Sequence, residues 1–536
     1  MRLFRMNVGQ TRVRLVQMGA ALAAAALIAG CGSQYRSVVT PVNPSGPASQ
    51  DQSWAVVVSA PSSTTNGVTT AQAGVATIID YSGDSIMAWQ YLLGTGPTSL
   101  TVDGTGSTGY TINSDQTMTS FPVSYTFQYK AENYVTLAPN ALPVNLFAPS
   151  SALWIADRYN GTIDIETGSP QSFVDAVPVG NAPVMMIGPS SNSSRNFAVS
   201  QNITNASGLE CNASPSTQVA GQVTGIEVSS TGYSLDAALP VGKCPVYAVE
   251  SSDGQRLFVI NRGSDTVSVI NVKKDALDDC APFTNPENLE TVTCHPTLPL
   301  SLGAVTTTGI TPFNGTTGMT QTAGPVYAEY NATNQQLIVA DYDGGTISVI
   351  DVPLDEWGND YNTYSADGKT ITGGFGKTHT VKVGNNPASV TVLVDGSRAY
   401  TANQTDSTVS IVNLSSYTKE KADLGVVGHP RTVVSTQNST YGKVYVASPD
   451  SNVLTIISTV DDNVDTTQTV TGNVVDVRVS TQNAVSGNNN NVSRVPGFGQ
   501  PCNLPISEFD PTASGGTLTG CKAQVYTAPT TTATKK

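Results

Sequence analysis

Few side chains in this sequence could carry out acid–base or nucleophilic chemistry. The chain has 536 residues with only three histidines and seven cysteines. This excludes multi-haem and multi-copper enzymes, which need many imidazole or sulfur ligands. His429 stands between a glycine and a proline, and His379 precedes a β-rich run. No Ser-His-Asp or Cys-His set can be assembled around either of them. We interpret His429 as a variable turn residue and His379 as solvent-facing, and we favour a protein without catalytic activity.

Four aspartates raise the question of a calcium site: Asp253, Asp341, Asp343 and Asp406. Calcium needs several carboxylate or carbonyl oxygens in one loop. The run from Asp341 to Gly344 lacks the downstream acidic residue of a calcium loop. All four aspartates lie in expected hairpin turns, where an aspartate accepts local backbone hydrogen bonds. We therefore predict turn chemistry and no cofactor, with calcium as the alternative.

Three aromatic residues mark the best candidate for an exposed binding loop. Trp357, Tyr361 and Tyr364 lie together with acidic residues in the segment Asp355–Ser365, DEWGNDYNTYS. Clustered aromatic side chains of this kind often anchor a protein partner or a glycan. The sequence indicates a binding role for this loop but does not identify the ligand.

The cysteines are consistent with an exported protein. Apart from Cys31 there are six: Cys211, Cys244, Cys280, Cys294, Cys502 and Cys521. An even number in an exported chain favours disulfides. Short loops favour Cys280–Cys294 and Cys502–Cys521, which leaves Cys211 to pair with Cys244. The chain has no CxxC pair that would favour zinc and no CxxCH for covalent haem.

The N-terminal residues are typical of a targeting segment. Residues 1–30 contain four arginines and no acidic residue, followed by an apolar stretch from Met18 to Ile28 that is too short to span a bilayer. The ending Leu27-Ile28-Ala29-Gly30-Cys31 resembles the bacterial lipobox. This resemblance implies cleavage before Cys31 and attachment of diacylglycerol and a further acyl chain, such as palmitate, to that residue. An ordinary secretory signal is the alternative.

The lipobox resemblance also implies a location. Gly32 and Ser33 follow Cys31 with no adjacent aspartate, which by analogy with enterobacterial sorting favours the outer membrane over the inner one. Residues 31–52 are rich in proline and serine and are expected to form a flexible tether. We predict a protein of the cell envelope, anchored to the membrane through lipid.

Composition predicts strands and turns and excludes a nucleic-acid partner. Charged residues make up 12% of the chain, and 26 Lys and Arg stand against 40 Asp and Glu, for a net charge of −14. Such a chain offers no basic surface for phosphate backbones. The 48 glycines and the abundance of threonine and valine are typical of an all-β protein.

Internal repeats predict the architecture. The segment Arg256–Val272, RLFVINRGSDTVSVINV, recurs near residues 336, 398 and 443, with an earlier copy near 152. Each copy has two alternating β-branched runs around a polar turn, which is the pattern of a hairpin. A glycine followed within three residues by a proline precedes most copies, as at Gly242-Lys243-Cys244-Pro245. The core unit of roughly 40–45 residues predicts a four-stranded propeller blade.

The repeats resemble those of the YVTN family of β-propellers, most closely at Leu257–Asn261 and Thr266–Asn271. The resemblance implies a β-propeller over about residues 53–485, followed by an Asn-, Gly-, Pro- and Thr-rich loop and tail over 486–536. Counting strand starts gives eight blades, and seven is the alternative. The eight-blade count requires the C-terminal strand that starts near Val474 to join Trp54–Ala60 and Val75–Tyr81 in one blade, closing the ring.

Together these features predict a lipid-anchored exported protein whose propeller serves as a binding or assembly platform. Two alternatives stay open. One is a propeller enzyme of the lactonase or quinoprotein-like type with its site in the central funnel. The other is a polysaccharide-binding surface protein.

Overall fold

The structure is a computed structural model. It describes residues 54–65, 68–81, 83–123, 132–137, 141–149, 152–168, 171–188, 195–203, 219–229, 232–272, 276–277, 283–284, 291–292, 297–300, 323–354, 362–364, 371–436 and 438–480. These residues all belong to one compact unit, Asp51–Lys536. Their regular structure consists of β-strands throughout. Within these ranges no helix has the length and apolar character needed to cross a membrane.

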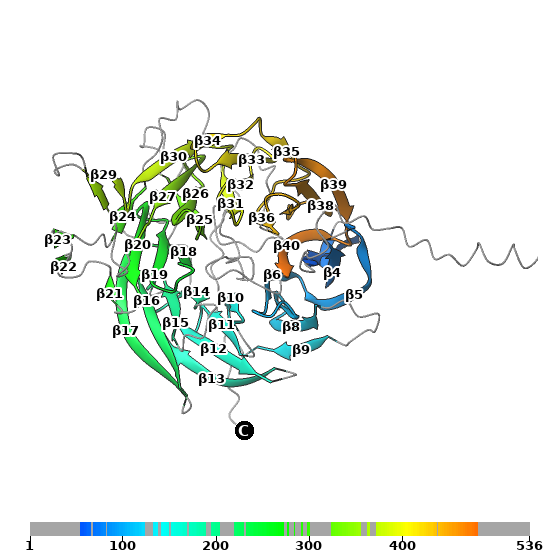
Figure 1. The fold of residues 1–536 in the computed structure, drawn as a ribbon. Helices are drawn as coiled ribbons and strands as arrows, with labels where there is room; N and C mark the ends of the chain where they lie inside the picture. Colours follow the sequence, from blue (N-terminus) through cyan, green and yellow to red (C-terminus); the bar gives the residue numbers. More distant parts are fainter. Residues whose placement is uncertain are drawn as a thin grey trace, which may run out of the picture. The chain divides into compact units, whose positions relative to one another are not determined.

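Eight antiparallel sheets form the blades of a β-propeller, which confirms the predicted fold class (Figure 1). From the innermost strand outward, the first four are blade 1, β40 (Asn473–Ser480), β1 (Trp54–Ala60), β4 (Ala73–Asp80) and β5 (Ile86–Thr95); blade 2, β6 (Pro97–Val102), β7 (Thr108–Asn113), β8 (Thr117–Pro122) and β9 (Asn133–Thr136); blade 3, β10 (Pro143–Phe147), β11 (Leu153–Asp157), β12 (Thr162–Thr167) and β13 (Ser172–Pro178); and blade 4, β14 (Pro183–Ile187), β15 (Arg195–Ser200), β16 (Ala220–Ser229) and β17 (Gly232–Lys243).

The remaining blades follow the same order. They are blade 5, β18 (Pro245–Glu250), β19 (Arg256–Asn261), β20 (Thr266–Asn271) and β21 (Ala276–Leu277), with β24 (Thr297–Pro299) also paired to β20; blade 6, β25 (Pro325–Asn331), β26 (Gln336–Asp341), β27 (Thr346–Asp351) and β30 (Thr378–Lys382); blade 7, β31 (Pro387–Val392), β32 (Arg398–Asn403), β33 (Thr408–Asn413) and the short β34 (Thr418–Lys419) and β35 (Leu424–Gly425); and blade 8, β36 (Thr432–Ser435), β37 (Lys443–Ala447), β38 (Val453–Ser458) and β39 (Asn463–Thr469).

Three two-stranded hairpins lie outside the blades: β2 (Ser62–Thr65) with β3 (Val68–Ala71), β22 (Phe283–Thr284) with β23 (Thr291–Val292), and β28 (Asn362–Tyr364) with β29 (Ile371–Gly374). Each is inserted between strands of the repeating unit. They leave the four-stranded pattern of the blades intact.

The innermost strands make a closed ring. Each contacts the innermost strand of the next blade, in the order β40, β6, β10, β14, β18, β25, β31, β36 and back to β40 (Figure 1). A seven-membered ring would leave one of these contacts out. The structure therefore confirms eight blades rather than seven.

The ring closes where the two ends of the propeller meet, as the sequence predicts. Strand β40 pairs antiparallel with β1, from Trp54 opposite Ser480 to Ala60 opposite Asn473. On its other edge β1 pairs with β4, with Trp54 opposite Asp80. Blade 1 therefore combines strands from both ends of the propeller, so that no blade has to end the array with an unpaired inner edge.

Hydrogen bonds explain the repeated Asn, Thr and Ser of the sequence. In blade 5 the Asn261 amide at the end of β19 donates to Thr266 Oγ1 at 3.2 Å and to Ser268 Oγ at 2.9 Å. In blade 7 Asn403 makes the same bonds to Thr408 and Ser410, at 3.0 and 2.8 Å. Because these bonds tie the second strand to the third across their turn, the spacing of the three residues is kept from blade to blade.

The Gly–Pro marker also has a structural cause. The residue before the opening proline adopts left-handed backbone conformation in five blades, with φ of 60° at Gly96, 52° at Ala182, 48° at Cys244, 57° at Gly324 and 55° at Asn386. A β-bulge follows each of those prolines. This bend turns the chain from the outer strand of one blade into the inner strand of the next. Pro430 differs slightly, because β36 begins two residues later, at Thr432.

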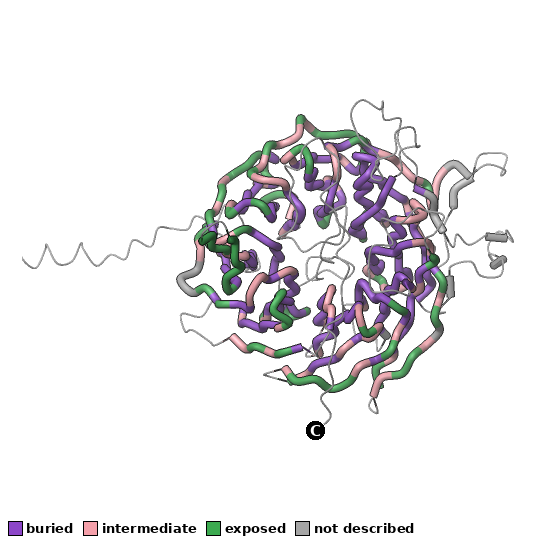
Figure 2. The backbone as a smooth tube through the Cα atoms, turned by 180° about the vertical axis from the view of Figure 1, so that it is seen from behind, coloured by how far each residue is buried: buried purple, intermediate pink, exposed green. Residues whose placement is uncertain are grey.

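Burial falls from the axis to the rim. Strands β18 and β31 are buried over their whole length, whereas β39 and β13 are largely exposed (Figure 2). Side chains on both faces of the inner strands therefore pack between blades. This radial packing stabilises the ring, because each blade covers apolar side chains of the two blades beside it.

Candidate functional site

The centre of the ring holds charged side chains on strands that are otherwise apolar. Asp476 and Arg478 lie on β40 and are 0% exposed. Arg478 Nη2 lies 3.0 Å from Asp476 Oδ2. Its Nη1 donates to the carbonyl of Val477 at 3.3 Å. An ion pair removed so completely from water costs free energy unless hydrogen bonds compensate, so its position on an innermost strand calls for an explanation.

A second arginine lies beside this pair. Arg431 immediately precedes β36, is 0% exposed, and donates from Nη2 to the Val475 carbonyl of β40 at 3.2 Å. Burial lowers the pKa of Arg431 to about 10, with Asp476 opposing the shift and Arg478 adding to it. Two guanidinium groups and one carboxylate therefore share a small volume between blades 8 and 1.

Two tyrosines lie on the innermost strands of blades 5 and 6. Tyr247 of β18 and Tyr327 of β25 have ring centroids 4.4 Å apart. Burial raises the pKa of Tyr247 well above its ordinary value, Tyr327 and Glu329 act in the same direction, and Arg478 opposes them. Blades 1 and 5 are diametrically opposed in a ring of eight. Tyr247 and Asp476 each follow the bulge of their innermost strand, so the repeat places them at the same level on opposite sides of the ring.

The axial cluster, meaning Arg431, Asp476, Arg478, Tyr247, Tyr327 and Glu329, thus draws on four blades. Asp476, Tyr247 and Tyr327 each stand directly after the bulge of their innermost strand. At the same place in other blades are residues that bond the neighbouring blade. Asn145 Oδ1 accepts from the amide of Met186 at 2.9 Å, and Ser389 Oγ donates to the carbonyl of Arg431 at 2.9 Å.

A second set of polar contacts joins neighbouring blades next to the turns after their second strands. Arg158 donates to Gln201 Oε1 at 2.9 Å, and Gln201 donates to the Pro245 carbonyl at 3.0 Å. Further round the ring, Tyr342 donates to Gln404 Oε1 at 2.8 Å. These residues each follow the end of a second strand, so the repeat places them at one level of the ring, where they bridge blades 3 to 5 and 6 to 7.

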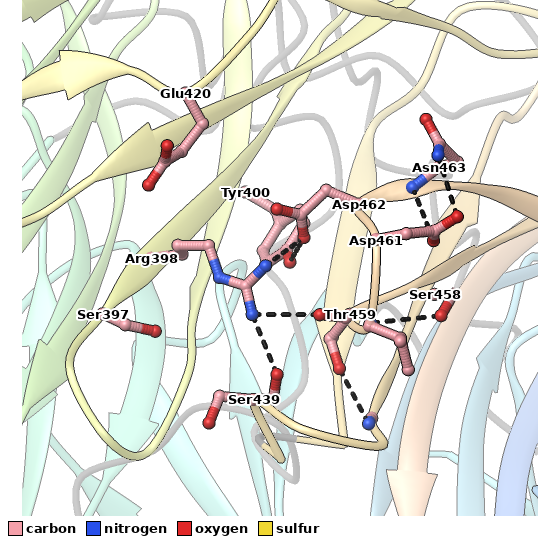
Figure 3. A network of polar contacts seen from close by, with 12 residues as sticks. Ser397, Arg398, Tyr400, Glu420, Ser439, Ser458, Thr459, Asp461, Asp462 and Asn463 are labelled. Atoms are coloured by element: carbon pink, nitrogen blue, oxygen red, sulfur yellow. Dashed lines mark hydrogen bonds and ion pairs between the residues drawn. The ribbon is translucent and has the colours of Figure 1, made fainter. Parts of the chain in front are cut away.

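Blades 7 and 8 are also joined by the network drawn in Figure 3. Arg398 at the start of β32 pairs with Asp462, and the same Asp462 oxygen accepts from Tyr400. Arg398 Nη2 donates to the carbonyls of Ser439 and Thr459 at 2.9 and 3.0 Å. Lys443 pairs with Asp84 at the equivalent place between blades 8 and 1. Both contacts link the first residue of a second strand to a turn of the next blade.

We expect Arg398→Ala to lower the free energy of unfolding by about 2–4 kcal/mol, because it leaves Asp462 without its guanidinium partner. The matched control is Lys419→Ala, which removes the more exposed ion pair to Asp423 and should cost at most about 1 kcal/mol. Urea unfolding of both variants measures the difference. Equal midpoints for the two variants would show that the network does not join the blades energetically.

His429, the histidine most open to a catalytic interpretation, takes part in a repeated turn contact. Its amide donates to Asp450 Oδ1 at 2.8 Å, and its Nδ1 lies 2.6 Å from Asp450 Oδ2. In blade 7 Asn385 meets Asp406 in the same way, through its amide at 2.7 Å and its side chain at 2.9 Å. The structure therefore supports the interpretation of His429 as a turn residue that substitutes for asparagine.

We predict that His429→Asn leaves the free energy of unfolding within about 0.5 kcal/mol of wild type, because asparagine can make the same contact to Asp450. His429→Ala should cost about 1 kcal/mol, the usual loss of one such hydrogen bond. Thermal unfolding compares the two. A larger loss for the asparagine variant than for the alanine variant would contradict the assignment.

The remaining candidates for acid–base or metal chemistry also contact other residues. The interpretation of His379 as solvent-facing is wrong, because its side chain is only 23% exposed, its ring stacks on that of Tyr417 with the centroids 3.7 Å apart, and its Nε2 lies 3.5 Å from Asp351 Oδ2. Asp253 accepts from Ser251 Oγ at 2.6 Å, and Asp343 pairs with Arg262 at 3.1 Å.

Asp341 is buried and accepts from Ser348 Oγ at 2.7 Å and from Thr346 Oγ1 at 3.1 Å. Asp406 accepts from Asn385. Asp253 behaves as turn chemistry predicts, since it also accepts from the Gln255 amide at 3.0 Å. The prediction is wrong for Asp341, which ends β26 and accepts from side-chain hydroxyls. Asp343 pairs with Arg262 of the neighbouring blade rather than within its own turn. Among the residues placed by the structure, no three His, Cys, Asp or Glu side chains gather as metal ligands.

The predicted binding loop and most of the cysteines cannot be placed. Trp357 and Tyr361 lie outside the described residues, and Tyr364 ends β28, with its side chain likewise not described. Cys31, Cys211, Cys280, Cys294, Cys502 and Cys521 also lie outside them. Cys244 is buried before β18. The disulfide pairing therefore stays a prediction.

Sequence reasoning missed the axial cluster. A signal was present, since charged residues interrupt apolar strands in VVDVRVS at Val474–Ser480 and follow the marker proline at Arg431. Tyr327 packs between blades 5 and 6 through its contact with Tyr247.

No protein-family model and no curated protein matches this sequence. Among solved structures, the chain is similar to apo AztD from Citrobacter koseri, with a TM-score of 0.49, 12% identity, and coverage of 81% of this chain and 99% of that one. It is also similar to a putative 6-phosphogluconolactonase from Bacteroides fragilis, with a TM-score of 0.42, 14% identity, and coverage of 81% of this chain and 99% of that one. It is similar as well to the dihydro-heme d1 dehydrogenase NirN, with a TM-score of 0.47, 14% identity, and coverage of 80% of this chain and 76% of that one. These likenesses concern the fold alone.

Proposed function

We propose that this protein is an exported lipoprotein whose β-propeller acts as a rigid, non-catalytic binding platform in the cell envelope. The observation that supports the platform is the way its polar side chains are used. His429, Asp406, Arg398 and Tyr342 are each engaged in contacts that hold turns or neighbouring blades together. A ring fixed in this way presents loops at constant positions, which suits recognition of a partner.

The membrane location rests on the lipobox resemblance at Cys31. Two or more acyl chains on one residue would give stable anchoring, where a single chain gives marginal binding. The proline- and serine-rich tether would hold the propeller away from the lipid surface. The predicted disulfides, including Cys211–Cys244, fit an exported protein.

The anchor is tested by fractionation of cells that carry full-length protein. Wild type should be recovered with membranes and should shift in mass on lipidation, whereas Cys31→Ala should remain unlipidated. Wild type without acyl chains, or with an intact signal, would contradict the lipoprotein proposal. This outcome would leave the platform proposal to be judged separately.

The platform is tested by affinity capture from detergent-solubilised envelopes. We expect one protein or glycan partner to co-purify in stoichiometric amount, and Trp357→Ala to reduce its recovery if the predicted loop binds it. His429→Asn is the matched control, because it changes a turn residue and should retain the partner. Repeated recovery of the protein alone would contradict the platform.

An enzyme with its site in the central funnel is the second candidate, and the axial cluster favours it. The test is a lactone-hydrolysis screen with and without chelator. Turnover that falls after Arg478→Lys but not after Arg398→Lys would favour the enzyme proposal over the platform proposal. Absence of turnover over a broad lactone series would leave the platform as the better proposal.

A further inference from the structure

We infer that the axial cluster is a binding site for a small monocarboxylate, held by the side edge of Arg478. The argument begins with the atoms of that guanidinium. Nε and Nη2 of Arg478 are fully buried and have no hydrogen-bond partner among the residues placed by the structure. Asp476 Oδ2, although 3.0 Å from Nη2, is likewise without an aligned hydrogen bond. Asp476 therefore balances the charge of Arg478 but leaves its Nε and Nη2 donors without an aligned acceptor.

Those two nitrogens form the edge of arginine that matches a carboxylate. Nε–H and Nη2–H point in parallel and bind both oxygens of a planar oxyanion at once. A buried donor left without an acceptor costs about 1–3 kcal/mol, and more when it is charged. A bound carboxylate would supply both acceptors. The side edge of Arg478 is thus set up for a ligand that the described part of the chain does not provide.

The neighbours of Arg478 define the charge of the ligand. Arg431 contributes a second positive charge beside the Asp476–Arg478 pair, since it donates to the Val475 carbonyl of the same strand at 3.2 Å, and an anion between the two guanidinium groups would balance this charge. Asp476 lies 3.0 Å from Arg478, and Glu329 lies two residues after Tyr327 on β25. These carboxylates would repel a dianion such as phosphate more strongly than a monoanion. The mixed charge therefore favours a single carboxylate.

The tyrosines indicate the chemistry of the ligand beyond its carboxylate. Tyr247 and Tyr327 place a pair of aromatic rings, with centroids 4.4 Å apart, on β18 and β25, at the position after the bulge that Asp476 holds on β40. Such a surface suits an aromatic or aliphatic acid whose apolar part packs on the rings. Two sources share this chemistry, namely a free organic acid and a side-chain carboxylate from residues 481–536, which follow β40 and include Glu508 and Asp510.

The test uses full-length protein, benzoate as probe and inorganic phosphate as the comparison anion, with calorimetry and thermal unfolding as readouts. We expect benzoate to bind wild type and raise its unfolding temperature, with phosphate at least tenfold weaker. Arg478→Lys keeps the positive charge but lacks the two parallel N–H donors, and it should weaken benzoate binding at least tenfold. Arg398→Lys is the matched control. It changes an arginine of the blade 7–8 network and should bind benzoate like wild type.

A second arm separates the two sources. If Glu508 or Asp510 occupies the edge, wild type should bind benzoate weakly, and the double variant Glu508→Gln, Asp510→Asn should bind it at least tenfold more tightly. Asp476→Asn gives an independent measurement should Arg478→Lys not fold, because removal of the competing carboxylate should tighten benzoate binding severalfold. The inference is overturned if neither wild type nor the double variant binds benzoate. It is also overturned if Arg478→Lys or Asp476→Asn binds it as wild type does.

Discussion

A chain that ends at Gly472, and so lacks β40, should fail to unfold cooperatively and should bind hydrophobic dyes at room temperature. The deletion removes the innermost strand of blade 1 and exposes the edge of β1 to water. It also removes Val474, Val475, Val477 and Val479, which are at most 1% exposed. At about 1.5–3 kcal/mol for each buried side chain, the loss is about 6–12 kcal/mol. This is comparable with the whole stability of an ordinary domain.

The matched control is a chain that ends at Ser480, which keeps β40 and its pairing with β1. It should unfold in one transition, measured by tryptophan fluorescence and by circular dichroism. Adding a synthetic peptide of residues 473–480 to the shorter chain should restore part of the transition, because the missing strand pairs through backbone bonds. A chain ending at Gly472 that melts as steeply and at the same temperature as the control would refute the closure.

Much of this architecture could be predicted because the repeat encodes it locally. The Asn–Thr–Ser spacing of blade 5 fixes a hairpin by its own hydrogen bonds, so the pattern is visible wherever the unit recurs. Closure of the ring could be predicted by assigning each expected strand to a blade. Trp54–Ala60 lacked a first strand, and the run at Val474 lacked its second and third. The count of eight thus required only short-range patterns and one long-range pairing.

The axial cluster could not be predicted in the same way. Arg478 and Tyr247 belong to opposite blades, and nothing in either local pattern relates one residue to the other. Their relative position depends on the number of blades, because that number decides the diameter of the ring and which innermost strands lie opposite one another. In contrast, the contact between His429 and Asp450 could have been inferred from Asn385 and Asp406, since the repeat aligns the two turns.

Comparison of equivalent positions also shows how blade 6 differs from blades 2, 5 and 7. At the end of the second strand, blades 2, 5 and 7 have Asn113, Asn261 and Asn403, whose amides donate to hydroxyls of the third strand. Blade 6 has Asp341 there, and the hydroxyls of Thr346 and Ser348 donate to it instead. Its Oδ1 is buried without a hydrogen-bond partner in the described part of the chain.

Asp341→Asn should therefore stabilise the protein at alkaline pH by about 3–5 kcal/mol, since one pKa unit corresponds to about 1.4 kcal/mol. Burial raises the pKa of Asp341 from 3.8 to about 8, against the hydrogen bonds of Ser348 and Thr346, and Asp265 and Asp343 add to the rise. A carboxyl whose pKa is raised on folding holds its proton more tightly in the folded state. Its contribution is complete below pH 3.8 and is lost as the pH rises toward 8.

The measurement is urea unfolding between pH 4 and pH 9. Wild type and Asp341→Asn should be similar at pH 4 and diverge until about pH 8, after which the difference should stay constant. Burial also raises the pKa of Glu250 to about 8 and that of Glu166 to about 7, so both proteins keep some decline with pH. The matched control is the reverse change in blade 7, Asn403→Asp, which should introduce a loss of stability at alkaline pH. Parallel pH profiles for wild type and Asp341→Asn would show that Asp341 is ionised in the folded ring throughout this range.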